Sequence, residues 1–194
     1  ENLQEMINFT PFNYMSEDQR FAANRTDVLF FQTDILTEDI TLGGEIMAKL
    51  KVSTTGTDAD FVVKLVDVYP GKIETEPMLV ENQKLLAGKG VIMSNYHQMV
   101  RSEIMRARFR NSFERPEPFT PNKVTDVNFR LQDVLHTFKK GHRIQIQVQS
   151  TMFPIFDRNP QKFVPNIYLA DEKDFQKATH RVYSNSVIEV QVLK

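Results

Sequence analysis

The chain contains no cysteine and no tryptophan among its 194 residues. Without a thiol, thiol catalysis, zinc–thiolate sites and disulfide bonds are excluded, although this absence does not identify the compartment. A chain of this length buries about 70% of the surface that it would expose when unfolded. Its core therefore needs neither a disulfide nor a metal ion.

Glycine is also scarce, with seven residues. None of them falls in the pattern of a phosphate-binding loop or a dinucleotide fingerprint. The serine hydrolase elbow, G-x-S-x-G, is absent as well; it needs small flanking residues because its nucleophile sits on a strained turn. We therefore expect no catalytic residue and no cofactor in this chain.

Long apolar runs and an excess of one charge are missing too. No run approaches the roughly 18 residues of a membrane-spanning helix, and the net charge is −1. We expect a soluble chain that binds neither membrane nor nucleic acid. The start, ENLQEMINFT, does not begin with Met and has no signal-peptide pattern, so we expect a fragment or a processed product. The compartment stays open, with a periplasmic or secreted location favoured over a cytoplasmic one.

Strands dominate the pattern after one short helix. Ser16 and Gln19 have the spacing of a capping box, which predicts a helix over 17–23. The expected strands are 27–36, 45–54, 60–70, about 98–109, and the alternating runs Val127–Leu131, Ile144–Val148 and Ile188–Val192. The run 60–70 is apolar on both faces, which predicts a strand that is covered on both sides.

Seven to nine strands without a βαβ rhythm predict an all-β fold. The favoured architecture is an antiparallel two-sheet sandwich of the jelly-roll type. The region 80–95 is harder to interpret and could hold a short helix or an inserted hairpin around Ala87–Gly90. A long polar loop, 157–185, precedes the last strand, and its centre, DEKDFQKATH, is predicted to be partly helical.

Metal-ligand patterns are weak. The four histidines never fall at the i, i+2 or i, i+4 spacing that brings two ligands together, so we favour surface or hydrogen-bonded histidines over a metal site. Asp58 and Asp60, in TTGTDADF, could supply oxygen ligands to calcium. The same Gly, Thr and Asp residues are typical of a turn between strands, and we favour the turn.

Three arginines, Arg106, Arg108 and Arg110, are expected to project from one face of a strand. They could bind phosphate or carboxylate groups. Three glutamates lie close in the sequence: Glu103, Glu114 and Glu117. We therefore favour an outward strand face with salt bridges over a nucleic-acid site.

The stretch FPIFDRNP, 153–160, directly follows the regular run RIQIQVQSTM. Its prolines predict a stiff corner at the end of a strand, fixed by hydrogen bonds or an ion pair of Asp157 and Arg158. The aromatic side chains in and after this stretch could stack on a sugar, but core or interdomain packing is favoured. They are Phe153, Phe156, Phe163 and Tyr168.

Four stretches, in order, carry a family resemblance. They are RTDVLFFQTDILTEDITLGGEI, VSTTGTDADFVVKLVDVYP, MRARFRNSFERPEPFTP and HTFKKGHRIQIQVQSTMFPIFDRNP. From about Arg25 to Leu193 the chain resembles the C-terminal domain of the X-prolyl dipeptidyl-peptidase and cocaine-esterase superfamily of serine hydrolases. That group also includes the α-amino-acid ester hydrolases and the glutaryl-cephalosporin acylases.

The resemblance implies a galactose-binding-like jelly roll over 25–194 that follows an α/β-hydrolase domain. That missing domain would carry the Ser-Asp-His triad, and the jelly roll would pack on it and help to wall its cleft. No member of the triad can be placed on this chain. Residues 1–24 would then be the connecting segment from the upstream domain.

The leading hypothesis is therefore a non-catalytic accessory domain of a dipeptidyl-peptidase, esterase or acylase. The expected docking residues are Phe153, Phe156, Asp157, Arg158 and Asn159, with Arg108, Arg110 and Asn111 as second choices. The alternative is a stand-alone carbohydrate-binding module, although tryptophan, the commonest sugar-stacking residue, is absent. A homo-oligomer is a third possibility, for which an exposed apolar edge of the sandwich would be the sign.

Overall fold

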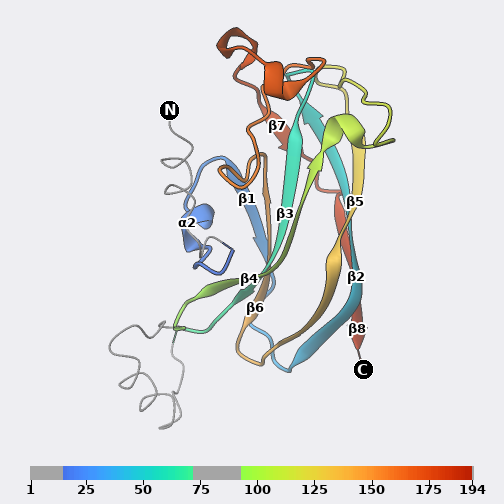
Figure 1. Cartoon of the computed structure of the whole chain (residues 1–194). Helices are drawn as coiled ribbons and strands as arrows, with labels where there is room; N and C mark the ends of the chain where they lie inside the picture. Colours follow the sequence, from blue (N-terminus) through green and yellow to red (C-terminus); the bar gives the residue numbers. More distant parts are fainter. Residues whose placement is uncertain (1–14, 72–92, 194) are drawn as a thin grey trace.

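The computed structural model describes residues 15–71 and 93–193 (Figure 1). Over these residues, eight strands form two antiparallel sheets that face each other. The predicted all-β, jelly-roll sandwich is confirmed.

Each sheet has four strands. The first sheet, sheet A, has the order β1-β6-β3-β4 and consists of β1 (Val28–Gln32), β3 (Asp60–Val68), β4 (His97–Arg106) and β6 (Arg143–Gln149). The second sheet, sheet B, is built around β2 (Ile40–Thr54), which pairs with β5 (Thr125–Phe138) on one side and with β7 (His180–Val182) and β8 (Val187–Leu193) on the other. The helical elements are short: α2 (Arg20–Ala23), η1 (Ala107–Phe109), η2 (Ile167–Leu169) and η3 (Glu172–Asp174).

The core lies between the sheets and follows the alternation expected from the sequence. Four side chains of β2 face it and are at most 2% exposed: Ile46, Ala48, Leu50 and Val52. On the opposite face of β2, Lys49 forms an ion pair with Glu189 at 2.6 Å and Lys51 one with Asp126 at 2.5 Å. The strand is thus half-buried, as its pattern predicts.

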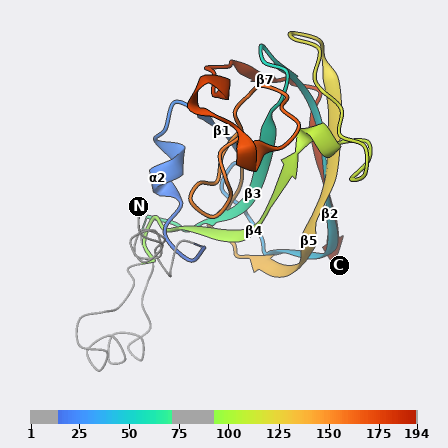
Figure 2. The same ribbon diagram turned by 45° about the horizontal axis from the view of Figure 1, so that its top comes forward.

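Strand β3 is buried on both faces. Phe61, Val63 and Leu65 point into the core, while Val62 and Lys64 on the outer face of sheet A are buried just as completely. Two segments cover this outer face, α2 with the chain before it and the loop that follows β6 (Figures 1 and 2). The predicted strand with both faces covered is confirmed.

The first covering segment, residues 16–23, is called the strap below. Its backbone is tied to β4, because the N–H of Gln19 donates to the carbonyl of His97 at 2.9 Å. Its side chains are tied to β3, because the Lys64 ammonium donates to Gln19 Oε1 at 2.8 Å. Ala22 is buried against the sheet. The strap is therefore packed as part of the sandwich.

The predicted capping box of Ser16 and Gln19 is wrong. The helix begins at Arg20, and its N-cap residue, Gln19, makes no side-chain cap hydrogen bond. Gln19 Nε2 instead donates to the carbonyl of Glu17 at 2.8 Å, while its oxygen is used by Lys64. A buried ammonium needs an acceptor, and this need overrides the local capping geometry.

Two further expectations differ from the structure. The first strand stops at Gln32, and the fourth ends at Arg106 because the chain turns into η1. The loop before the last strand is partly helical, as predicted: in DEKDFQKATH the helical element is η3, with Asp171 and Asp174 forming its capping box. The helix or hairpin expected near Ala87–Gly90 lies outside the described residues.

Replacing Lys64 tests how its burial supports the strap. Lys64→Met should change the free energy of unfolding by no more than about 1 kcal/mol, because a straight apolar chain fills the same space without a charge to desolvate. Lys64→Ala should destabilise by about 2–4 kcal/mol, because it leaves a cavity. Urea unfolding measures both. A Met variant as unstable as the Ala variant would show that the bond to Gln19, and not packing, holds this face.

Candidate docking site

The second covering segment, residues 151–164, is called the corner below. It leaves the end of β6 in a tight turn, in which the carbonyl of Met152 accepts from the N–H groups of Ile155 at 3.0 Å and Phe156 at 3.3 Å. The Phe153–Pro154 peptide bond in this turn is cis. The predicted strand-end corner is therefore present.

The corner presents aromatic side chains to the surface. Phe153 is 54% exposed and Phe156 is 37% exposed, so neither belongs to the core. The Arg158 guanidinium lies 5.4 Å from the centre of the Phe153 ring. Tyr168, farther along the chain, is exposed as well. The sequence analysis favoured packing in the core or between domains for these aromatic side chains. Packing in the core is wrong for Phe153, Phe156 and Tyr168.

Asn159 fixes the corner to the sheet. Its amide nitrogen donates to Asp60 Oδ1 at 2.8 Å, and its oxygen accepts from the N–H of Gln161 at 2.8 Å. Both Asn159 and Asp60 are buried. The predicted anchors make weaker contacts, because the carboxylate of Asp157 lies 4.0 Å from Arg106 and is mostly exposed.

A buried ion pair supports the other end of the corner. Arg108 Nε donates to Asp58 Oδ2 at 2.8 Å, and both side chains are shielded from solvent. Arg108 Nη2 also donates to the carbonyl of Val164 at 2.8 Å, and the guanidinium lies 4.4 Å from the centre of the Phe163 ring. One side chain thus joins the β2–β3 loop to the end of the corner.

The expected common strand face of Arg106, Arg108 and Arg110 is wrong. Only Arg106 belongs to β4; Arg108 lies in η1 and turns inward, because the buried carboxylate of Asp58 requires a charged partner. Arg110 does form a surface ion pair, 3.4 Å from Glu117. The Asn111 amide donates to the same carboxylate at 2.8 Å.

A groove of about 650 Å³ brings members of both predicted docking sets together. Phe156 of the corner lines it together with Arg106, Arg110, Asn111 and Phe113. Phe113 is itself largely exposed. The corner and the segment after β4 therefore form one continuous surface.

Burial changes the protonation of the two aspartates beneath the corner. Desolvation raises the pKa of Asp60 to about 6, although the Asn159 hydrogen bond and the charge of Arg106 act in the opposite direction. Desolvation also raises the pKa of Asp58, against the attraction of Arg108. Asp58 lies in the loop between β2 and β3, where the favoured interpretation placed a turn, and calcium binding stays the untested alternative; in the structure the two carboxylates hold Asn159 and Arg108.

Two histidines converge on one carboxylate, which the sequence pattern did not reveal. His136 Nε2 and His142 Nδ1 each lie 2.8 Å from a different oxygen of the buried Asp67. The three residues come from β5, the turn before β6, and β3, so no spacing along the chain could have signalled them. Within 15–71 and 93–193, no group of three or more His, Cys, Asp or Glu side chains is arranged to hold a metal ion.

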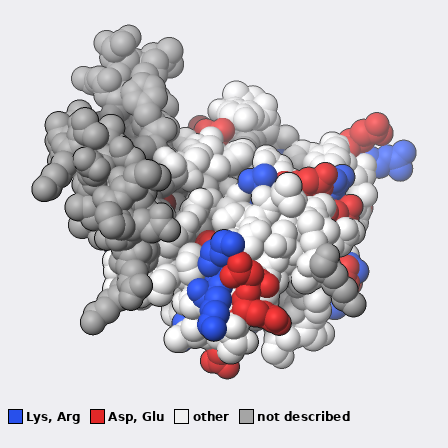
Figure 3. All heavy atoms as spheres, turned by 90° about the horizontal axis from the view of Figure 1, so that it is seen from below, with Lys and Arg blue, Asp and Glu red and all other residues white. Residues whose placement is uncertain are grey.

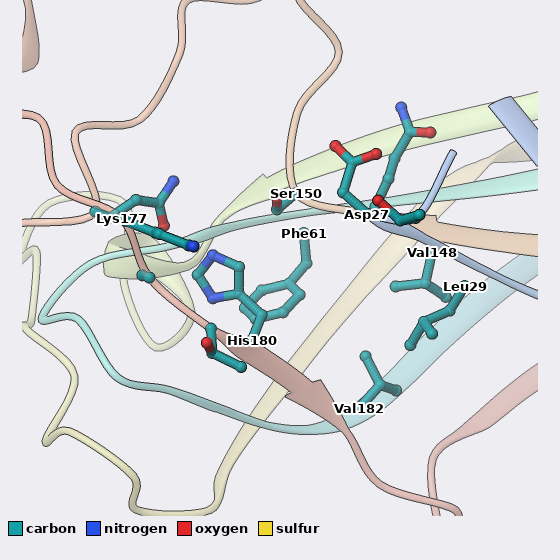
Figure 4. Close-up of a pocket in the computed structure, with 13 residues that line it drawn as sticks. Asp27, Leu29, Phe61, Val148, Ser150, Lys177, His180 and Val182 are labelled. Carbon is teal, nitrogen blue, oxygen red and sulfur yellow. The ribbon is translucent and has the colours of Figure 1, made fainter. Parts of the chain in front are cut away.

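A second hollow, of about 440 Å³, lies beside the corner. Leu29, Val148 and Val182 gather at one end of it, and Lys177 and His180 lie at the other (Figure 4). Desolvation lowers the pKa of His180 below its usual value, which favours a neutral ring. This hollow has an apolar wall and a polar rim.

Charges on the surface are mixed. On the face shown in Figure 3, basic side chains lie beside acidic ones. In the described part of the chain, no helix is long and apolar enough to cross a membrane.

The fold and the site define a jelly-roll domain whose buried polar groups hold a surface corner in place. The chain belongs to the family described as the X-Pro dipeptidyl-peptidase C-terminal non-catalytic domain, whose family model matches residues 9–191. This membership confirms the predicted family and the non-catalytic nature of the domain.

Three relatives illustrate the match. The chain is 31% identical to cocaine esterase of Rhodococcus sp. (strain MB1 Bresler) over 142 residues, which is 73% of this chain and 21% of that protein. Among solved structures, an aminopeptidase from a marine sediment Thaumarchaeota archaeon has a TM-score of 0.82 and 40% identity, covering 93% of this chain and 28% of its own. An α-amino acid ester hydrolase has a TM-score of 0.81 and 43% identity, covering 92% and 28%. The chain therefore spans between a fifth and a third of each relative.

The raised pKa of Asp60 predicts a pH-dependent stability. The folded chain holds the Asp60 proton up to about pH 6, while the unfolded chain releases it near the ordinary value of 3.8. Between these values the folded state binds more protons, so this group lowers stability as the pH rises. Asp60→Asn should remove that fall, because an amide does not titrate and still accepts from Asn159. Denaturant unfolding from pH 4 to pH 6 measures it; an unchanged slope in the variant would contradict this assignment.

Removing one partner of the buried Asp58–Arg108 ion pair should lower the free energy of unfolding. Arg108→Met should destabilise the chain by about 3–5 kcal/mol, because it leaves the Asp58 carboxylate buried without compensation. The double variant Asp58→Leu with Arg108→Met is the matched control and should recover much of that loss. Guanidinium unfolding compares the two. Equal losses in both variants would mean that packing on Phe163, and not the charge, is what Arg108 contributes.

Proposed function

We propose that this chain packs against the α/β-hydrolase domain of a larger serine hydrolase and helps to shape its substrate cleft. The observation that carries this proposal is the corner, which presents Phe153 and Phe156 to the surface on a base fixed by buried polar contacts. Exposed aromatic rings on a rigid base are typical of the anchors at protein interfaces.

The size of the relatives supports the proposed partner. Most of each matched protein lies outside the part that this chain covers. The family description calls the domain C-terminal and non-catalytic, so a catalytic domain must supply the chemistry. An upstream domain of the same polypeptide is therefore the natural occupant of the corner and its groove.

The role of the docked domain would be positioning and exclusion of water. Ester or amide hydrolysis by an acyl-enzyme route depends on a substrate held in one orientation, and a wall of the cleft contributes to that orientation. The relatives are named as an aminopeptidase, an ester hydrolase and a cocaine esterase. The choice between such substrates belongs to the hydrolase pocket.

The other expectations from the sequence rank below this one. The family match does not favour a stand-alone carbohydrate-binding module. A homo-oligomer and a periplasmic or secreted location stay predictions, which light scattering and cell fractionation of the complete protein would test.

Docking through the corner is tested in the complete hydrolase. Phe153→Ser together with Phe156→Ser should lower the temperature at which the catalytic domain unfolds and reduce kcat/KM for an activated ester, because the apolar contact is lost. In the 194-residue chain alone, the same change should alter the free energy of unfolding by no more than about 0.5 kcal/mol, because both rings are at the surface.

The matched control is Leu135→Ser, which removes an exposed apolar side chain from β5 in the other sheet. It should leave the catalytic domain unchanged. Docking at the corner is excluded if the double variant and this control behave alike in the complete protein.

A further inference from the structure

Two side chains of β1 face the core yet are exposed. Leu29 pairs with the buried Val148 of β6, and Phe31 pairs with Ile146, which packs against the core. Paired residues point to the same face of a sheet, so both belong to the inner face. Nevertheless Leu29 is 45% exposed and Phe31 is 58% exposed.

The last strand, β8 of sheet B, also has side chains that face the core and are nevertheless exposed. Val190 pairs with Ile46, and Val192 pairs with Leu42; both partners are fully buried core residues. Val190 is 39% exposed and Val192 is 57% exposed. The inner faces of β1 and β8 are therefore apolar without being covered.

The reason is that the sandwich is closed along one edge and open along the other. On one edge, β4 of sheet A lies against β5 of sheet B. On the other edge, two hollows of about 440 and 310 Å³ lie between the sheets, and both are lined by Val148 and Val182. Figure 4 shows the larger of the two. An apolar opening of this kind marks an interaction surface.

We propose that this open edge, defined by Leu29, Phe31, Val190 and Val192 with the two hollows, is covered by the upstream hydrolase domain of the same polypeptide. The proposal rests on the proposed function and adds a second contact surface to the corner. The partner surface must be apolar at its centre, since Leu29, Val148 and Val182 line the hollow, and polar at its rim, where Asp27 and Lys177 lie.

The course of the chain argues for this occupant. The strap begins beside β4, lies on the outer face of sheet A and leads through four residues, 24–27, into β1, so the chain runs to the open edge before its first strand. In the α-amino acid ester hydrolase and the aminopeptidase, 72% of the chain lies outside the matched part (100% minus the 28% covered). A domain tethered to the same polypeptide has a much higher effective concentration at this edge than a second copy.

The corner and the open edge are also continuous with each other. Ser150, directly before the corner, and Gln161, within it, both line the larger of these two hollows. One partner surface can therefore rest on the corner and extend over the edge. This continuity would give the domain a single orientation, which a contact at the corner alone would not fix.

Hydroxyl-radical footprinting of the complete hydrolase tests the proposal, because it measures the accessibility of individual side chains. Val192 is compared with Val124, which is 48% exposed and lies before β5, and Leu29 with Leu135, which is 77% exposed. The pairs are matched in residue type. We expect Val192 and Leu29 to be oxidised several-fold more slowly than their controls.

Phe31→Ser together with Val192→Ser should then raise the oxidation of Leu29 toward that of Leu135, while Val124→Ser should not. The proposal would be overturned if, in the complete hydrolase, the oxidation rates of Val192 and Leu29 matched those expected from their exposure in this domain alone. If Phe153 and Phe156 are protected in that case, docking at the corner stands without the open edge; if they are oxidised too, both proposals fail. Protection that disappears on dilution would assign the edge to a second copy and overturn the proposal.

Discussion

The burial of β3 on both faces is the constraint on which the rest of the structure depends. Its inner side chains complete the core, and its outer side chains require a cover, which the strap and the corner provide. Because that outer face includes Lys64 and Asp60, the cover must supply polar partners, and Gln19 and Asn159 do so. The position of both surface segments follows from these contacts.

Local patterns predicted the strands because alternation along a strand is set by the chain itself. The core face of β2 and the double burial of β3 follow from side chains a few residues apart. Predictions that depended on distant partners failed. Gln19 does not cap the helix, because its side-chain oxygen accepts a hydrogen bond from Lys64, 45 residues away. Arg108 does not lie on the strand face, because its guanidinium donates to Asp58, 50 residues away.

The candidate site was foreseen in part. The composition of FPIFDRNP predicted a stiff corner with aromatic side chains. It did not show that Asn159 anchors the corner, whereas the side chain of Asp157 is mostly exposed to solvent. The open edge could not be foreseen, because alternation shows which face of a strand is apolar and not whether another layer covers it. Val190 and Val192 have the pattern of core residues and remain exposed.

The central claim is that this domain is completed by another domain of the same polypeptide, on the corner and along the open edge. A structure of the complete hydrolase by crystallography or electron cryomicroscopy tests this claim most directly. The account predicts that Phe153, Phe156, Phe31 and Val192 are buried against the catalytic domain. A structure in which all four side chains face solvent would contradict it.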